Sequence, residues 1–220
     1  MLTVSIQPLK VILNEVGGDR VEVRCLIPPG ASPHGWKPRP SDMKNLSQSL
    51  ALFHVDDHFD GWVSGLPVPQ KIPLLSELPA ELLIESGRGY PADPRMSSQH
   101  QSSHDHVSPV VNPHFWTDPI AVIASAQIMS KHCAALDPEG SSFYQRQCVD
   151  FILRLKNLHR INLEKLAPYQ GLSILQFHPS FDYLLNRYGL SSAGSIEPSP
   201  GQEPTPWELH HIIGIIKNGN

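Results

Sequence analysis

The chain has 220 residues, a formal net charge of −4 at pH 7 and a sequence pI near 6.3. This length allows one large domain or two small ones around a hydrophobic core, and a hydrophobic content of 40% excludes a wholly disordered chain. The acidic balance argues against nucleic acid or an anionic membrane surface as a partner, because both require a basic face.

The first part of the chain predicts a β-α-β unit. Residues 3–6 and 21–27 have the pattern of short buried strands, and the apolar residues between them, 9–16, have the three-and-four spacing of a helix that ends at a glycine pair. Ser41 is the expected N-cap of a second helix. Residues 50–55 form an apolar run that predicts a third strand.

The middle of the chain gives weaker signals. Residues 66–97 are interrupted by proline and glycine, and we predict no order of elements there. The next segment, residues 96–109, is polar, low in complexity and rich in histidine, with His100, His104 and His106. Its lack of apolar residues predicts a surface loop outside the core.

Two consecutive long helices follow. Asp118 is the expected N-cap of the first, and the proline that follows it is the expected first helical residue. Residues 120–136 are apolar on most faces, so we expect this helix to be largely buried. Asp137, again before a proline, repeats the start signal. The apolar stripe over residues 144–158 then predicts a second helix that runs to about Leu166.

Alternation of strand and helix resumes near the C-terminus. Residues 172–177 predict a strand, residues 181–188 a helix that Gly189 ends, and residues 205–217 a last helix. The expected fold class is α/β, with two α/β lobes that have parallel-type sheets, a long helix joining them, and an incomplete second lobe. No run approaches the roughly 18–20 apolar residues that span a bilayer, so we expect a soluble chain.

Three histidines lie where a metal site would be expected. His34 and His178 follow predicted strands, in loops that leave the carboxyl edge of a sheet, where α/β folds bind ligands. His114 lies in a proline-containing turn, residues 112–116, with aromatic neighbours. Three imidazoles and an oxygen make a common tetrahedral shell for Zn²⁺. Their spacing matches no local zinc motif, and each of them alone could equally be a turn residue bonded to backbone.

Cysteine gives little further guidance. Cys25, Cys133 and Cys148 form no C-x-x-C pair, so they indicate neither a zinc knuckle nor a redox motif. The start of the chain, MLTVSIQPLK, has neither the basic nor the apolar region of a signal peptide. Histidine, at 12 residues, therefore supplies the most probable kind of metal ligand in this chain.

Motifs spread over nearly the whole chain occur in a defined order: SIQPL and GGDRVEV, then PGASPH and PRPSDM, then NPHFWTDP, and finally FHPSFDY and RYGL. In this order they resemble the solute-binding proteins of bacterial ABC importers for zinc and manganese (cluster A-I), in which the middle motif is usually D-P-H-x-W-x-D-P. Carried over residue by residue, the resemblance implies metal ligands at His34, His114 and His178, with the metal between two lobes.

The resemblance also implies a function. It implies high-affinity capture of Zn²⁺, with Mn²⁺ as the alternative ion, and delivery to an ABC permease by a monomeric protein that is not an enzyme. The location it implies is the periplasm or the cell surface, although this chain carries no signal peptide. The loop with His100, His104 and His106 lies where zinc-selective members often have a histidine-rich insertion, and it is either a weak metal collector or a solvated linker.

The expected division follows the same resemblance. Residues 1–116 would be an N-terminal metal-binding lobe with the histidine-rich loop 96–109, residues 117–167 the connecting helices, and residues 168–220 a partial C-terminal lobe. The chain stops where the family continues to a carboxylate that commonly supplies a fourth ligand. We therefore expect a fragment with the less stable half at its end.

Besides the early end of the chain, one more departure from the pattern and three rival functions remain open at this point. Asn112 replaces the family's usual aspartate, which removes a charge near the site. Asp60 and Trp62 resemble an acidic-aromatic element for which we expect packing rather than ligation. The rivals are a manganese-binding homologue, a surface adhesin, and a zinc-dependent hydrolase, since an open fourth position resembles a catalytic site. The sequence contains no H-E-x-x-H motif to support a hydrolase.

Overall fold

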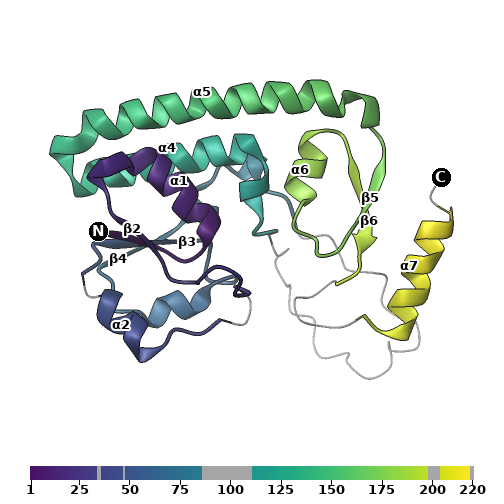
Figure 1. Cartoon of the computed structure of the whole chain (residues 1–220), viewed down its shortest axis with the longest axis horizontal. Helices are drawn as coiled ribbons and strands as arrows, with labels where there is room; N and C mark the ends of the chain where they lie inside the picture. The colour runs from purple at the N-terminus through teal and green to yellow at the C-terminus, as the bar shows by residue number, and fades with distance from the viewer. Residues whose placement is uncertain (34–35, 47, 86–110, 198–203, 219–220) are drawn as a thin grey trace. The chain divides into compact units, whose positions relative to one another are not determined.

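The computed structural model of the chain describes residues 1–33, 36–46, 48–85, 111–197 and 204–218 (Figure 1). It consists of two compact units: unit 1, Met1–Leu82 with Asp118–Ile161, and unit 2, Leu83–Thr117 with Asn162–Asn220. Within the described part, no helix combines the length and the apolar character that crossing a membrane requires. The division expected at residues 116 and 167 stays a prediction.

The centre of unit 1 is a four-stranded parallel sheet in the order β2-β1-β3-β4. Its strands are β1 Leu2–Val4, β2 Val23–Cys25, β3 Ala51–His54 and β4 Gln70–Pro73. Every residue of β1 and β3 is buried, as expected for inner strands of a parallel sheet covered on both faces. The three strands predicted in this region are confirmed, whereas β4 was not predicted.

Helices cover both faces of this sheet. Their bounds are α1 Gln7–Gly17, α2 Pro40–Leu46, α3 Leu74–Glu77, α4 Pro119–Leu136 and α5 Ser141–Leu166. Figure 1 shows α1 and α4 on one side of the sheet and α2 on the other, while α5 runs along α4. The α/β class predicted from the sequence is confirmed, because alternating strands and helices have formed a parallel sheet between helical layers.

The helix starts follow short-range capping signals. The Asp118 carboxylate accepts a hydrogen bond from the Ile120 amide at 2.9 Å, which confirms it as the N-cap of α4. The prediction for α2 is wrong by two residues, since Ser41 lies inside the helix. Instead, the Asp42 carboxylate accepts from the Arg39 amide at 2.8 Å, as the third helical residue does in a capping box.

The apolar stripe of α5 is buried over most of its predicted length. Tyr144, Cys148, Phe151 and Leu155 are buried, but Leu158 is 45% exposed. The reason is a difference in length, since α5 has 26 residues and α4 has 18. α5 follows α4 after a short turn and runs along it, so the longer helix has residues that α4 cannot cover.

The described residues of unit 2 include a two-stranded parallel sheet, β5 Ser173–Gln176 and β6 Ser191–Ser195, and the helices α6 Asp182–Arg187 and α7 Pro206–Asn218. The predictions of β5, α6 and α7 are confirmed. Gly189, at a φ of 70°, follows α6 as expected, because glycine adopts this left-handed conformation without strain. Strand β6 was not predicted, since its sequence SSAGS has no large apolar residue.

A polar cluster joins the turn between α4 and α5 to the 3-10 turn that follows α1. The Asp137 carboxylate accepts from Arg20 Nε at 2.6 Å and from the Tyr144 hydroxyl at 2.7 Å, and it also accepts from the Gly140 amide at 3.2 Å. The hydrogen bond from Arg20 is the main cause that holds the pKa of Asp137 well below its usual value. Burial in turn raises the pKa of Tyr144 to about 12.

We expect Asp137→Asn to reduce the loss of stability in acid. A carboxyl group whose pKa is lowered in the folded state contributes stability above its unfolded pKa, near 3.9, and loses that contribution as the pH falls. The asparagine keeps the capping oxygen but cannot titrate. Urea unfolding followed by circular dichroism at pH 7 and pH 2.5 measures the difference.

The matched control is Glu139→Gln, which removes an exposed carboxylate from the same turn. This control should lose as much stability on acidification as the wild type. An equal acid sensitivity of Asp137→Asn and the wild type would show that Asp137 is not linked to folding.

Candidate metal centre

Two of the three histidines singled out from the sequence lie side by side in unit 2. His114 is 7% exposed and precedes the 3-10 turn Phe115–Thr117, and His178 follows β5. Their ring centroids are 5.3 Å apart and the ring planes meet at 77°. Both ring nitrogens of His178 are buried. The fold therefore brings together two imidazoles that are distant in the sequence.

This separation fits shared coordination of one cation. Two imidazoles that bind the same zinc ion through bonds of about 2.0–2.1 Å have ring centres roughly 5 Å apart at a tetrahedral angle. The observed separation of 5.3 Å agrees with that geometry. The ring planes meet at 77°, so the two imidazoles face in different directions. Two ligands on neighbouring corners of a tetrahedron also face in different directions. The pair can therefore supply half of a zinc shell with little rearrangement.

Backbone and aromatic contacts hold the His114 segment in place. The Asn112 amide donates to the Ile84 carbonyl at 2.8 Å, and the Tyr183 hydroxyl donates to the Asn112 carbonyl at 2.8 Å. The ring of Trp116 lies 5.2 Å from that of His114, with their planes at 68°. The aromatic ring of Trp116 covers one side of the imidazole. A rigidly held and partly desolvated imidazole results.

Side-chain amides connect both histidine segments to one carboxylate. Asn112 Oδ1 lies 2.9 Å from His114 Nδ1, and Asn112 Nδ2 donates to Asp182 Oδ2 at 3.1 Å. Gln176 Nε2 donates to the other oxygen, Asp182 Oδ1, at 2.6 Å. Sequence reasoning noticed Asn112 only as a departure from a motif and missed Asp182 and Gln176. The available signal was FHPSFDY, in which Asp182 follows His178 by four residues.

The remaining ligands expected from the sequence cannot be placed. His34 lies outside the described residues, as does the whole loop with His100, His104 and His106. Among the residues that the structure describes, no three histidine, cysteine, aspartate or glutamate side chains gather as a metal site requires. The described part of the centre is thus the pair of His114 and His178.

Cysteine does not add to this centre. Cys25, Cys133 and Cys148 are free thiols. Burial is the main cause that raises the pKa of Cys25 to about 11 and that of Cys133 to about 12, and it raises the pKa of Cys148 as well. Because the thiolate is the metal-binding form, these groups are poor ligands at neutral pH.

Other described histidines have structural partners. His132 Nε2 lies 2.9 Å from Glu77 Oε2, and the ring of His211 stacks on Trp207 with centroids 5.7 Å apart. His54 lies in the core of unit 1, 2% exposed, with its Nδ1 3.1 Å from Asp60 Oδ1. None of these three belongs to the pair described above.

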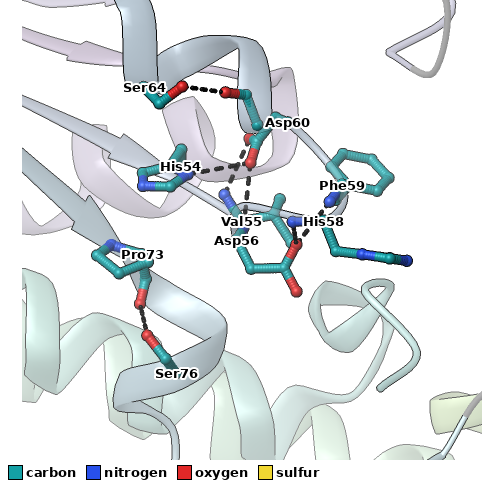
Figure 2. Close-up of polar contacts among 10 residues, drawn as sticks. His54, Val55, Asp56, His58, Phe59, Asp60, Ser64, Pro73 and Ser76 are labelled. Atoms are coloured by element: carbon teal, nitrogen blue, oxygen red, sulfur yellow. Dashed lines mark hydrogen bonds and ion pairs between the residues drawn. The ribbon is translucent and has the colours of Figure 1, made fainter. Parts of the chain in front are cut away.

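Figure 2 shows the surroundings of His54. The Asp60 carboxylate points back toward β3 and accepts from the amides of Val55 at 2.9 Å and Asp56 at 3.0 Å in addition to its contact with His54. Asp60 itself is fully buried. The packing role expected for Asp60 corresponds to this arrangement, in which the carboxylate closes the loop after β3 by satisfying two backbone amides.

Comparison with known proteins shows which family this chain matches. The family model of ZnuA, zinc-uptake complex component A periplasmic, matches residues 2–220. The high-affinity zinc uptake system protein ZnuA of Yersinia pestis is 27% identical over 220 residues, covering 94% of this chain and 69% of that protein. The corresponding Bacillus subtilis protein is 22% identical over 216 residues, covering 97% and 66%. The chain thus spans about two thirds of the length of these relatives.

A further relative is named for manganese. Solved structures have the same fold as this chain. The manganese-binding lipoprotein MntA of Halalkalibacterium halodurans is 22% identical, covering 98% of this chain and 67% of that protein. A crystal structure of ZnuA has a TM-score of 0.81 at 27% identity, covering 100% of this chain and 79% of that one. The laminin-binding adhesin of Streptococcus agalactiae, with a TM-score of 0.80 at 23% identity, shows the fold alone.

We expect Asp60→Ala to destabilise unit 1 strongly. The substitution leaves one buried and one partly buried backbone amide without their acceptor and removes the buried partner of His54. Losses of this kind lower the free energy of unfolding by about 3 kcal/mol or more. Chemical denaturation at pH 7 measures the change, with Asp57→Ala, which removes an exposed neighbouring carboxylate, as the control. A loss no larger than that of the control would contradict the closing role of Asp60.

Proposed function

Because the chain belongs to the family of ZnuA, zinc-uptake complex component A periplasmic, we propose that it captures Zn²⁺ with high affinity and delivers the ion to an ABC-type importer in the membrane. The single observation that carries the proposal is the pair of His114 and His178, whose rings lie 5.3 Å apart. The family is a component of metal uptake and not an enzyme. The zinc-dependent hydrolase considered from the sequence is therefore dropped.

The proposed ligands are His34, His114 and His178. Two of these imidazoles are held at a separation that suits zinc, and His34 is included on the strength of its place in the motif PGASPH. Three neutral imidazoles leave one position of a tetrahedral shell to an oxygen ligand. Because each imidazole contributes one nitrogen without charge, the ion keeps its double positive charge while it is bound.

Ligand chemistry supports zinc over manganese as the cargo. Imidazole suits Zn²⁺, whereas carboxylate and carbonyl oxygens suit Mn²⁺. The two named zinc-uptake relatives agree with this preference, and the manganese-binding relative keeps Mn²⁺ as the alternative ion. Elemental analysis of the purified protein, before and after treatment with a chelator, distinguishes the two ions.

The proposed partner is the permease of an ABC importer, and the proposed site of action is the periplasm or the outer cell surface. The family description names the periplasm, and the manganese-binding relative is named a lipoprotein. We propose that the protein acts as a monomer, since delivery of one ion needs no second copy of the chain. The formal charge of −4 agrees with a role that does not involve nucleic acid.

We expect His114→Ala and His178→Ala each to weaken zinc binding by at least about 100-fold. Each substitution removes one of a small number of ligands, and even outer-shell partners of a metal contribute 10–100-fold. Competition with a chromophoric chelator at pH 7.5 measures the affinity. His132→Ala removes an imidazole paired with Glu77 and should bind like the wild type. Wild-type affinity in both His114→Ala and His178→Ala would place the site elsewhere.

Deleting residues 97–108 should leave the high-affinity step within about threefold of the wild type, because a polar histidine-rich segment holds metal only weakly. A milder variant replaces His100, His104 and His106 by asparagine and keeps the length of the chain. Calorimetric titration with Zn²⁺ separates the tight site from weaker ones. Loss of the tight site in the asparagine variant, with His114→Ala unaffected, would move the site into the loop.

A further inference from the structure

We propose that Asn112 is the positioning residue that selects the metal-binding nitrogen of His114, and that Asp182 fixes Asn112 in this role. The inference rests on the proposed function, since it concerns a ligand of the proposed zinc site. It assigns a task to the residue at which the chain departs from the D-P-H pattern. The role of Asn112 follows from which of the surrounding atoms can donate a hydrogen bond and which can only accept one.

The direction of the Asn112 amide is set by two partners of opposite kind. Asn112 Oδ1 lies 2.9 Å from the backbone amide nitrogen of His114, which can only donate. Asn112 Nδ2 lies 3.1 Å from Asp182 Oδ2, and an ionised carboxylate can only accept. Turning the amide over would place donor against donor and acceptor against acceptor. The oxygen of Asn112 therefore faces His114.

The same oxygen determines the tautomer of His114. Asn112 Oδ1 also lies 2.9 Å from His114 Nδ1, and an amide oxygen can only accept, so Nδ1 must carry the proton. A neutral imidazole protonated at Nδ1 has its lone pair on Nε2. Metal-binding histidines generally donate from one ring nitrogen to an oxygen and bind the metal with the other. His114 is thus prepared to bind through Nε2 before any metal arrives.

A hydrogen bond from Gln176 fixes the Asp182 carboxylate in the same way. Gln176 Oε1 accepts from the Phe181 amide at 2.9 Å, which directs Gln176 Nε2 toward Asp182 Oδ1 at 2.6 Å and the Ser192 hydroxyl at 3.0 Å. Gln176 is 5% exposed and Asn112 is 3% exposed. Water therefore competes little for these hydrogen bonds. We call Gln176, Asp182, Asn112 and His114 the relay, because each member fixes the direction of the next.

The relay explains why an amide occupies position 112. A carboxylate there would face the Asp182 carboxylate at a separation of about 3.1 Å, and two like charges at this distance in a partly buried setting repel each other. The D-P-H pattern places a negative charge next to the imidazole. Here Asp182 supplies that charge, and the side chain of Asn112 lies between Asp182 and the imidazole. Asn112 transmits its polarisation through the amide to His114.

This account predicts the behaviour of four variants. Asn112→Leu removes the hydrogen-bond acceptor for His114. Asn112→Asp places a second carboxylate against that of Asp182. Asp182→Asn places the new amide nitrogen against the amide nitrogen of Asn112. Each single variant should weaken zinc binding by about 10–100-fold, the range measured for outer-shell partners of metal-binding histidines. The double variant Asn112→Asp with Asp182→Asn exchanges amide and carboxylate, keeps every hydrogen bond of the relay, and should return to within about threefold of the wild type.

The first measurement uses metal-free protein. Long-range proton–nitrogen correlation spectra, assigned by comparison with His114→Ala, should show His114 of the wild type and of the double variant protonated at Nδ1. Asn112→Leu should lose this fixed tautomer. A merely structural role of Asn112 would alter melting temperature without selecting a ring nitrogen. Protonation of wild-type His114 at Nε2 would overturn the proposal.

The second measurement is zinc affinity by chelator competition, with Asn157→Asp as the control. This substitution makes the same chemical change at an exposed position of α5 and should leave affinity unchanged. A double variant no tighter than the two single variants would also overturn the relay. Failure of the proposed function gives a different result, because the wild type would then not bind zinc while its His114 tautomer stayed fixed.

Discussion

The candidate metal centre depends on the hydrogen bonds that the Asp182 carboxylate receives from two segments far apart in the chain. Gln176 lies two residues before His178 and donates to one oxygen, and Asn112 lies two residues before His114 and donates to the other. One carboxylate at the start of α6 therefore sets the distance between the two histidine segments. The entropy of bringing two imidazoles together is lost during folding and does not reduce the affinity for the ion.

Buried or partly buried carboxylates have a different task in unit 1. Asp60 closes the loop after β3, and Asp137 joins the turn before α5 to Arg20. Asp60 accepts from the amides of Val55 and Asp56, which the loop would otherwise leave without partners, and Asp137 adds a second acceptor for the Gly140 amide. Asp60 is fully buried, whereas the side chain of Asp137 is 34% exposed, so solvent screens the ion pair of Asp137 more. These groups stabilise the scaffold, while Asp182 holds the segments that carry His114 and His178.

The sequence predicted those parts of the fold that depend on short-range signals. Aspartate followed by proline marked the starts at Asp118 and Asp137 because a cap and its helix are neighbours in the chain. Strand β6 escaped prediction because its burial comes from pairing with β5, and nothing in SSAGS reports that contact. At the centre, proline neighbours and loop position picked out His114 and His178. The role of Asp182 could not be predicted, since its partners Asn112 and Gln176 come from separate segments.

The difference between a motif and a site is clearest at position 112. Compared letter by letter with D-P-H, asparagine looks like the loss of a charge that would support the metal ligand. The geometry places an acceptor, Asn112 Oδ1, beside His114 Nδ1, and an amide oxygen can take this place when its nitrogen is bound to a carboxylate. An asparagine without Asp182 could turn over and present its nitrogen to the ring. The residue at 112 therefore has to be judged together with the residue at 182, because only the pair defines which nitrogen of His114 can hold a cation.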